Sequence, residues 1–221
     1  MKAGSKVFSD GDLIKMGWVK TKEKFGFIIL TVIVAFLIIY VPPVILDYIG
    51  RQLEMPGVFG LLSFLAFFLI SIWIGVGMIR IFLGLVDGKE VSMGDLFKGA
   101  DRILDYLAVM VLYTLIVFVG MILLVFPGII WSIKYIYAPL LVIDKGLGPI
   151  EALKASAELT NGVKWDILAF QGVLGYVILI GYAALIIGSV VAIPVAILAL
   201  IGMYRHHMPA GKSAPMPKTL S

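Results

Sequence analysis

Long stretches without a charged residue dominate the pattern of polar and apolar positions along this chain. Residues 25–46, 55–79, 106–133 and 167–204 contain no Asp, Glu, Lys or Arg, and a shorter uncharged stretch covers 135–143. The hydrocarbon core of a bilayer is about 30 Å thick, and a helix needs roughly 20 apolar residues to cross it. The pattern therefore predicts an all-α fold, a polytopic transmembrane helical bundle.

Two of the apolar stretches are too long for a single crossing, and each contains a residue pair that predicts where it divides. Pro127–Gly128 favours a turn over a continuing helix, and the stretch 167–204 divides most naturally near Gly188–Ser189. Six spans result, at about 26–47, 57–84, 103–126, 128–143, 167–187 and 189–205. Pro194 is expected to kink the last span. The sequence leaves open whether the short fourth span crosses fully or is re-entrant.

The placement of cations tests this count, because cytoplasmic loops accumulate Lys and Arg near the membrane. With six spans and an internal N-terminus, sixteen of the eighteen cations fall on one side. These are Lys2, Lys6, Lys15, Lys20, Lys22, Lys24, Arg80, Lys89, Lys98, Arg102, Lys145, Lys154, Lys164, Arg205, Lys212 and Lys218. We therefore expect a multi-pass protein of the plasma (inner) membrane with both termini cytoplasmic. Residues 1–208 would form one membrane domain, and 209–221 a flexible cytoplasmic tail.

Three polar segments that precede the first, third and fifth spans resemble one another. They read Gly-Asp-Leu-Ile-Lys at 11–15, Gly-Asp-Leu-Phe-Lys at 94–98 and Glu-Ala-Leu-Lys at 151–154. Each has apolar residues at helical spacing, which predicts an amphipathic helix along the cytoplasmic interface, with Lys15, Lys98 or Lys154 toward anionic lipid. The architecture would then repeat an interfacial helix and a helical hairpin three times. Chance similarity between short amphipathic segments is the alternative.

Composition narrows the classes of function. The chain is 61% hydrophobic and 14% charged, whereas soluble proteins are about 25% charged. It has no cysteine, which excludes disulfides and thiolate metal sites. His206 and His207 are adjacent and have no further ligand nearby in the sequence, so we expect no metal and no cofactor. The spans lack paired carboxylates and a Ser–His set, and phosphate-binding glycine motifs are absent, so we do not expect an enzyme. The net charge of +4 is spread over the connecting segments, and nucleic acid is not expected as a partner.

Lys134 is the sharpest candidate for a functional residue. An ammonium inside the membrane costs at least about 2.5–3.5 kcal/mol, and the uncharged stretches contain no carboxylate to pair with it. Together with Tyr135 and Tyr137, Lys134 is a candidate contact for an anionic lipid or solute. Alternatively, its side chain extends to the interface, or it bonds backbone carbonyls that are freed at Pro127 and Pro139.

Other residues are candidates for weaker reasons. Arg80 closes the second span, where it would anchor in the headgroups or share an anionic-lipid site with Lys98 or Arg102. Pro127, Gly128, Pro139 and Pro194 are candidate helix breaks, and broken helices mark binding sites in transporters. Gly and Pro are also common in transmembrane helices generally.

The stretch 120–162 carries a resemblance to known proteins. It contains Pro-Gly-Ile at 127–129, a basic residue in the following helix, Gly-Pro-Ile-Glu-Ala-Leu at 148–153 and Thr-Asn-Gly at 160–162. It resembles uncharacterised prokaryotic polytopic membrane proteins of the YciC type, and it is similar to the membrane domain of some glycerophosphodiester phosphodiesterases. The resemblance implies a fold and a membrane location. Phosphodiesterase catalysis belongs to a separate soluble domain of those proteins and is not implied.

Taken together, these patterns favour a non-enzymatic integral membrane protein that acts through lipid contact or as a subunit of a membrane complex. The expected partners are membrane lipids, with other membrane proteins or self-association as further options. The alternative is a small transporter or channel for an anionic solute or lipid that uses Lys134 and the broken fourth span.

Overall fold

The structure is a computed structural model in which residues 10–183 and 185–208 are described. All regular elements in these ranges are helical. They are α1 (Asp10–Glu23), α2 (Phe25–Gln52), α3 (Pro56–Val86), α4 (Ile103–Leu123), α5 (Val125–Lys134), α6 (Ala138–Lys145), α7 (Pro149–Leu159), α8 (Lys164–Ala183) and α9 (Leu185–His207), with the 3-10 turns η1 (Met93–Phe97) and η2 (Ala100–Arg102). The predicted tail at 209–221 and Lys2, Lys6, Lys212 and Lys218 lie outside the described residues.

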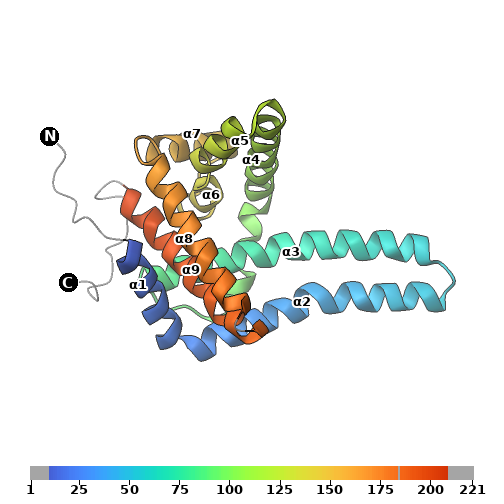
Figure 1. Ribbon diagram of the computed structural model, residues 1–221. Coiled ribbons are helices and arrows are strands. Elements are labelled where there is room, and N and C mark those ends of the chain that lie inside the picture. The colour runs from blue at the N-terminus through green and yellow to red at the C-terminus, as the bar shows by residue number, and fades with distance from the viewer. Residues whose placement is uncertain (1–9, 184, 209–221) are drawn as a thin grey trace.

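The long helices pair into three hairpins, which are α2 with α3, α4 with α5 and α6, and α8 with α9 (Figure 1). Six segments of the described chain are long and apolar enough to cross a membrane. This confirms the expected all-α class and is consistent with a multi-pass membrane protein. The α2–α3 hairpin extends away from the remaining helices in Figure 1.

The turn between the third and fourth spans lies at Leu124, three residues before the predicted position. Leu124 is extended, with φ −166° and ψ 144°, and it separates α4 from α5. Pro127 lies in the first turn of α5. Backbone N–H groups there have no acceptor within the helix, so the missing N–H of proline costs no hydrogen bond. Gly128 instead allows close packing, because an added Cβ would lie 2.8 Å from the backbone nitrogen of Met121.

The fourth span is interrupted just before Pro139, one of the candidate helix breaks. α5 ends at Lys134 and α6 begins at Ala138, so the interruption covers 135–137. Pro139 stands in the first turn of α6, where proline is favoured. The observed break therefore precedes Pro139.

The last hairpin differs from the prediction in that α9 includes the expected point of division. α8 ends at Ala183 and α9 begins at Leu185, so Gly188 and Ser189 lie inside α9. A Cβ on Gly181 would lie 3.0 Å from the carbonyl oxygen of Gly188, so small residues serve to bring the two helices together. α9 continues through Pro194, and α2 contains two prolines in its interior.

Each segment that precedes a hairpin packs on the second arm of the preceding hairpin, and the first segment packs on the second arm of the last hairpin. α1 packs on α9, η1 packs on α3, and α7 packs on α6, so the chain closes in a ring. The close approaches depend on glycine, because a Cβ on Gly17 would lie 2.5 Å from the carbonyl oxygen of Val195. The second segment forms 3-10 turns instead of the predicted α-helix. The repeat itself stays a prediction.

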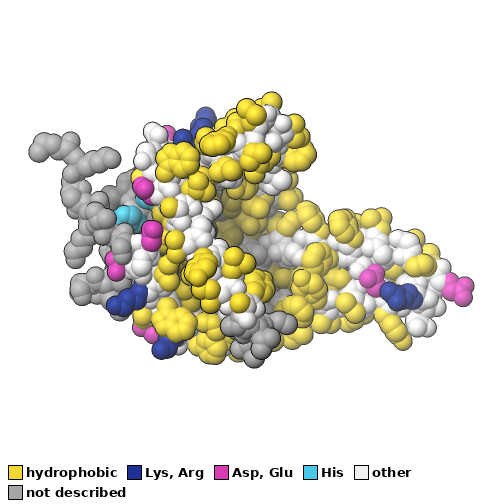
Figure 2. Space-filling model, in the orientation of Figure 1, with side chains coloured by type: hydrophobic (Ala, Val, Ile, Leu, Met, Phe, Trp, Pro, Cys, Tyr) yellow, Lys and Arg dark blue, Asp and Glu magenta, His cyan; other side chains and the backbone are white. Residues whose placement is uncertain are grey.

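The core lies where the three hairpins meet, away from their tips. α9 contains the most buried candidate span, whereas few residues in the most apolar windows of α2, α3 and α4 are buried. Figure 2 shows hydrophobic side chains along the α2–α3 hairpin, with charged side chains at its tip and at the opposite end of the molecule. This distribution is the one that a lipid environment requires.

Candidate functional site

The second arms of the three hairpins end at a buried ion cluster. Asp87 caps α3, Asp144 lies in the last turn of α6, and Arg205 lies in the last turn of α9. Arg205 donates from Nε to Asp87 Oδ1 at 2.8 Å and from Nη2 to Asp87 Oδ2 at 2.9 Å and Asp144 Oδ1 at 2.7 Å. We call these three residues the junction triad.

The triad is almost closed to solvent, so its charges depend on one another. The exposed fractions of the Arg205, Asp87 and Asp144 side chains are 2%, 3% and 11%. Tyr204 donates a further hydrogen bond to Asp144 at 2.9 Å. Two lysines outside the triad lie at its edge. Lys89 is 3.2 Å from Asp87, and Lys145 is 3.3 Å from Asp144. The charge of the buried guanidinium is thus opposed by two carboxylates. The excess negative charge of the two carboxylates is in turn opposed by Lys89 and Lys145.

A network of hydroxyl groups closes the break between α5 and α6. Ser156 of α7 donates to the Lys134 carbonyl at 3.0 Å and accepts from the Tyr137 N–H at 3.1 Å. Thr160 donates to the same carbonyl at 3.1 Å. The backbone groups freed by the break are therefore satisfied by α7, which fixes that helix against the hairpin.

Of the two tyrosines that were grouped with Lys134, Tyr135 lies beside its ammonium, whereas the Tyr137 side chain contacts His207. The Lys134 ammonium lies 5.0 Å from the centre of the Tyr135 ring, a cation–π contact. Tyr137 is fully buried, and its hydroxyl lies 2.9 Å from Nδ1 of His207. Among the described residues Lys134 has no carboxylate partner, and its ammonium makes no hydrogen bond to a carbonyl freed at the break.

A polar pocket of about 440 Å³ lies beside the junction triad. We call it the cationic pocket. Its charged lining residues are Arg80, Asp87, Lys89, Asp101, Arg102, Asp144 and Lys145. It therefore gathers four cations from α3, η2, α6 and the loop after α3. Two of its three carboxylates, Asp87 and Asp144, are already bound to Arg205.

Two arginines face each other across one exposed carboxylate in this pocket. Arg80 Nη2 lies 3.3 Å from Asp101 Oδ1, and Arg102 Nε lies 3.4 Å from Asp101 Oδ2. The Asp101 side chain is 65% exposed. Arg102 also donates to the carbonyl of Gly146 at 3.1 Å. Arg80 is thereby brought together with Arg102, one of the two residues with which the sequence suggested it might share a site.

The three predicted interfacial lysines have similar surroundings. In each motif the leucine is buried, at Leu13, Leu96 and Leu153, with exposed fractions of 2%, 0% and 6%. The lysines that follow, Lys15, Lys98 and Lys154, are exposed. Lys98 also pairs with Asp95 at 2.7 Å.

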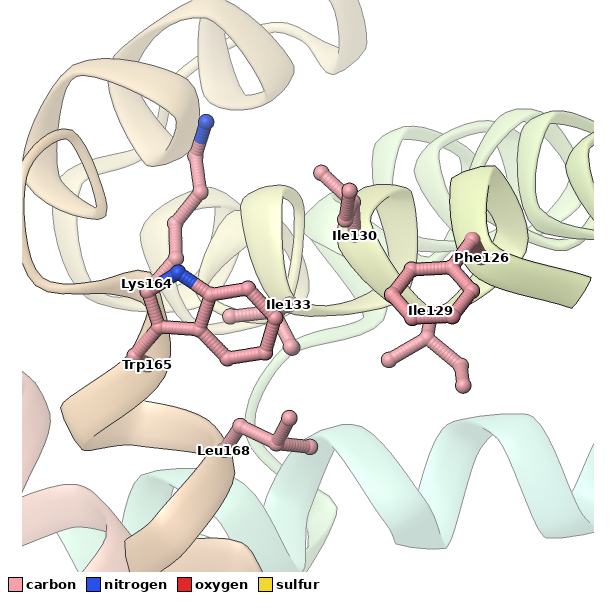
Figure 3. A pocket seen from close by; sticks show the side chains of 7 residues that line it. All are labelled: Phe126, Ile129, Ile130, Ile133, Lys164, Trp165 and Leu168. Carbon is pink, nitrogen blue, oxygen red and sulfur yellow. The ribbon is translucent and has the colours of Figure 1, made fainter.

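A second hollow, of about 390 Å³, lies between α5 and α8 (Figure 3). Ile129, Ile133 and Leu168 line it, with the Trp165 ring beside them. Lys164 belongs to the lining, but its ammonium points away from the apolar side chains in Figure 3. The hollow therefore brings no converging polar groups to a ligand.

The junction triad was not found from the sequence, where Asp87, Asp144 and Arg205 are isolated charges at the edges of apolar stretches. A signal was present, since Val-Asp-Gly-Lys at 86–89 and Ile-Asp-Lys-Gly at 143–146 both lie where the second arm of a hairpin ends. No group of three or more His, Cys, Asp or Glu residues able to hold a metal ion occurs in residues 10–183 and 185–208.

Comparison with known proteins finds distant relatives. No protein-family model matches the chain. An uncharacterised protein of Mycobacterium tuberculosis strain H37Rv is 28% identical over 150 residues, which cover 67% of this chain and 46% of that protein. An uncharacterised protein of Mycobacterium bovis aligns with the same identity and coverage. The chain thus spans less than half the length of these curated relatives. No solved structure matches.

Proposed function

We propose that the protein is a non-enzymatic integral membrane protein that acts by binding anionic lipid at the end of the molecule that contains the junction triad. The observation that carries this proposal is the cationic pocket, which is lined by four cations and three carboxylates, two of which also bind the buried Arg205. The exposed Lys15, Lys98 and Lys154 add positive charge in the segments that precede the hairpins.

Electrostatics supports lipid as the partner. A lysine or arginine near an anionic membrane surface contributes about 1 kcal/mol of attraction. In this proposal the apolar hairpins fix the depth of the protein in the membrane, and the buried leucine of each motif anchors the segment that carries its lysine. The three segments would lie in the cytoplasmic headgroup region of the plasma membrane and form the threefold repeat that the sequence predicts.

The first experiment measures the lipids that surround the protein in nanodiscs made from equal amounts of phosphatidylglycerol and phosphatidylcholine. We expect phosphatidylglycerol to be enriched around the wild-type protein. The combined variant Lys15→Gln, Lys98→Gln and Lys154→Gln should lose much of this enrichment, because three attractive charges are removed.

Arg51→Gln is the matched control, because Arg51 is exposed at the tip of the α2–α3 hairpin, far along the helices from the pocket. It should retain the wild-type enrichment. Equal amounts of both lipids around the wild-type protein would refute the proposal.

A transporter or channel for an anionic solute or lipid is the second candidate. The observation that favours it is the interruption of the fourth span at 135–137, next to the Lys134 ammonium, which has no carboxylate partner in the part of the chain that the structure describes. Flux of an anionic solute into proteoliposomes that is lost in Lys134→Ala would support this function over the first.

A further inference from the structure

We infer that the cationic pocket is a specific site for one phosphate group, held between the guanidinium groups of Arg80 and Arg102. This inference rests on the proposed function and deepens it, because it separates one defined site from the general attraction of the surface lysines. The phosphate could belong to a lipid headgroup or to a small soluble phosphate ester.

The first argument is the carboxylate that already lies between the two arginines. Asp101 contacts Arg80 at 3.3 Å and Arg102 at 3.4 Å, whereas charge-assisted N–H···O bonds are normally about 2.7–2.9 Å. The side chain of Asp101 is 65% exposed, so it can leave at little cost. Its carboxylate marks an anion position that a phosphate, with more acceptor oxygens, would fill better.

The second argument is an unsatisfied donor. Nε of Arg80 is buried and has no hydrogen-bond partner among the described residues. A buried donor without an acceptor costs about 1–3 kcal/mol, and an anion that reaches it would remove that cost. The Arg80 side chain as a whole is 30% exposed, so an anion in the pocket reaches the buried Nε only if the side chain turns.

The third argument is that the backbone is shaped around both guanidinium groups. Gly99 has φ +123°, and a Cβ there would lie 3.2 Å from Nε of Arg80. Gly146 has φ +64°, and a Cβ there would lie 2.8 Å from Nη2 of Arg102. Glycine is suited to such positive φ values and leaves room for both side chains.

The surroundings favour an anion over a cation. Lys89 and Lys145 line the same pocket, while Asp87 and Asp144 direct their oxygens to Arg205. Arg80 and Arg102 are opposed by Asp101 and by Asp105, whose Oδ2 lies 3.5 Å from Nη1 of Arg102. With Arg205 included, five cations meet four carboxylates, so the net charge around the pocket is positive.

The test uses the full chain in nanodiscs whose bulk lipid is phosphatidylcholine, to which one of two probes is added. Phosphatidylglycerol is added as a minor lipid and its retention is counted by native mass spectrometry, and glycerol 3-phosphate is titrated by calorimetry. Retention of the lipid without binding of glycerol 3-phosphate identifies a headgroup site, and binding of glycerol 3-phosphate identifies a site for soluble phosphate esters.

Arg80→Gln should weaken the binding of whichever probe binds by roughly 10- to 100-fold, the usual effect of losing a hydrogen bond to a charged group. Asp101→Asn should strengthen it several-fold, because the competing carboxylate is lost. Arg51→Gln, the same change at the hairpin tip, should leave it unchanged. A gain in Asp101→Asn supports the site even if an arginine variant fails to fold.

The inference is overturned if Arg80→Gln binds as tightly as Arg51→Gln, or if neither probe binds to the wild-type protein. In that case the general enrichment of phosphatidylglycerol in mixed nanodiscs can still be present, and the proposed function stands. Loss of that enrichment as well would refute both.

Discussion

The guanidinium of Arg205 bonds two carboxylates that stand at the ends of different helices. Asp87 caps α3 and Asp144 lies in the last turn of α6, where the negative end of a helix dipole disfavours an anion. Arg205 reverses this effect at both ends, and it brings three sequence-distant segments to one point. The triad is therefore a cross-link between the hairpins as well as a set of satisfied charges.

Removal of Arg205 should therefore be costly. Arg205→Met leaves two buried carboxylates without their partner, and breaking a buried ion pair in this way costs about 3–5 kcal/mol in the free energy of unfolding. Equilibrium unfolding in mixed detergent micelles would measure the loss. Arg51→Met, at the exposed hairpin tip, should change stability by less than about 0.5 kcal/mol.

The partners of Arg205 provide an internal check on that prediction. Adding Asp87→Asn and Asp144→Asn to Arg205→Met removes the unpaired charges, so the combined variant should be more stable than Arg205→Met alone. A combined variant whose losses simply add would show that the three side chains do not form one network.

At the scale of elements, the hairpins depend on small residues where helices and turns meet. Gly77 of α3 faces the backbone of Leu96 in η1, so that no side chain fits between them, whereas Gly75 has open space around its Cα. Neighbouring glycines on one helix therefore have different roles. Close packing of this kind is the main source of helix association in lipid.

Gly77→Ala should accordingly loosen η1 from α3 and lower the free energy of unfolding by about 1–3 kcal/mol, since a Cβ there overlaps the Leu96 carbonyl. Gly75→Ala is the matched control. It should be neutral or raise stability by up to about 1 kcal/mol, because alanine favours helix and nothing lies nearby. Thermal unfolding in detergent distinguishes the two, and equal effects would contradict the packing described here.

The sequence was informative about elements and much less about the site. Six spans followed from the uncharged stretches because lipid tolerates few alternatives to helix. The turns were displaced because Pro127 and Pro139 are both accepted in the first turn of a helix, and Gly188 packs inside one. The junction triad was missed because its members are isolated charges until the fold brings them together.

At the scale of the whole molecule, the three hairpins meet at the end that contains the junction triad and separate toward their tips (Figure 1). The predicted topology places this end, with Lys98 and Lys154, on the cytoplasmic side and the tip of the α2–α3 hairpin outside. Both the lipid proposal and the phosphate site depend on this orientation, because they require the cationic pocket to face anionic headgroups.

The absence of cysteine from the chain allows a direct test of that orientation. Single variants Gln52→Cys, Lys98→Cys and Lys154→Cys, all at exposed positions, would be treated in intact cells with a membrane-impermeant maleimide. We predict that Gln52→Cys reacts in intact cells, whereas Lys98→Cys and Lys154→Cys react only after permeabilisation. Reaction of Gln52→Cys and Lys154→Cys from the same side would contradict the threading of the hairpins through the membrane.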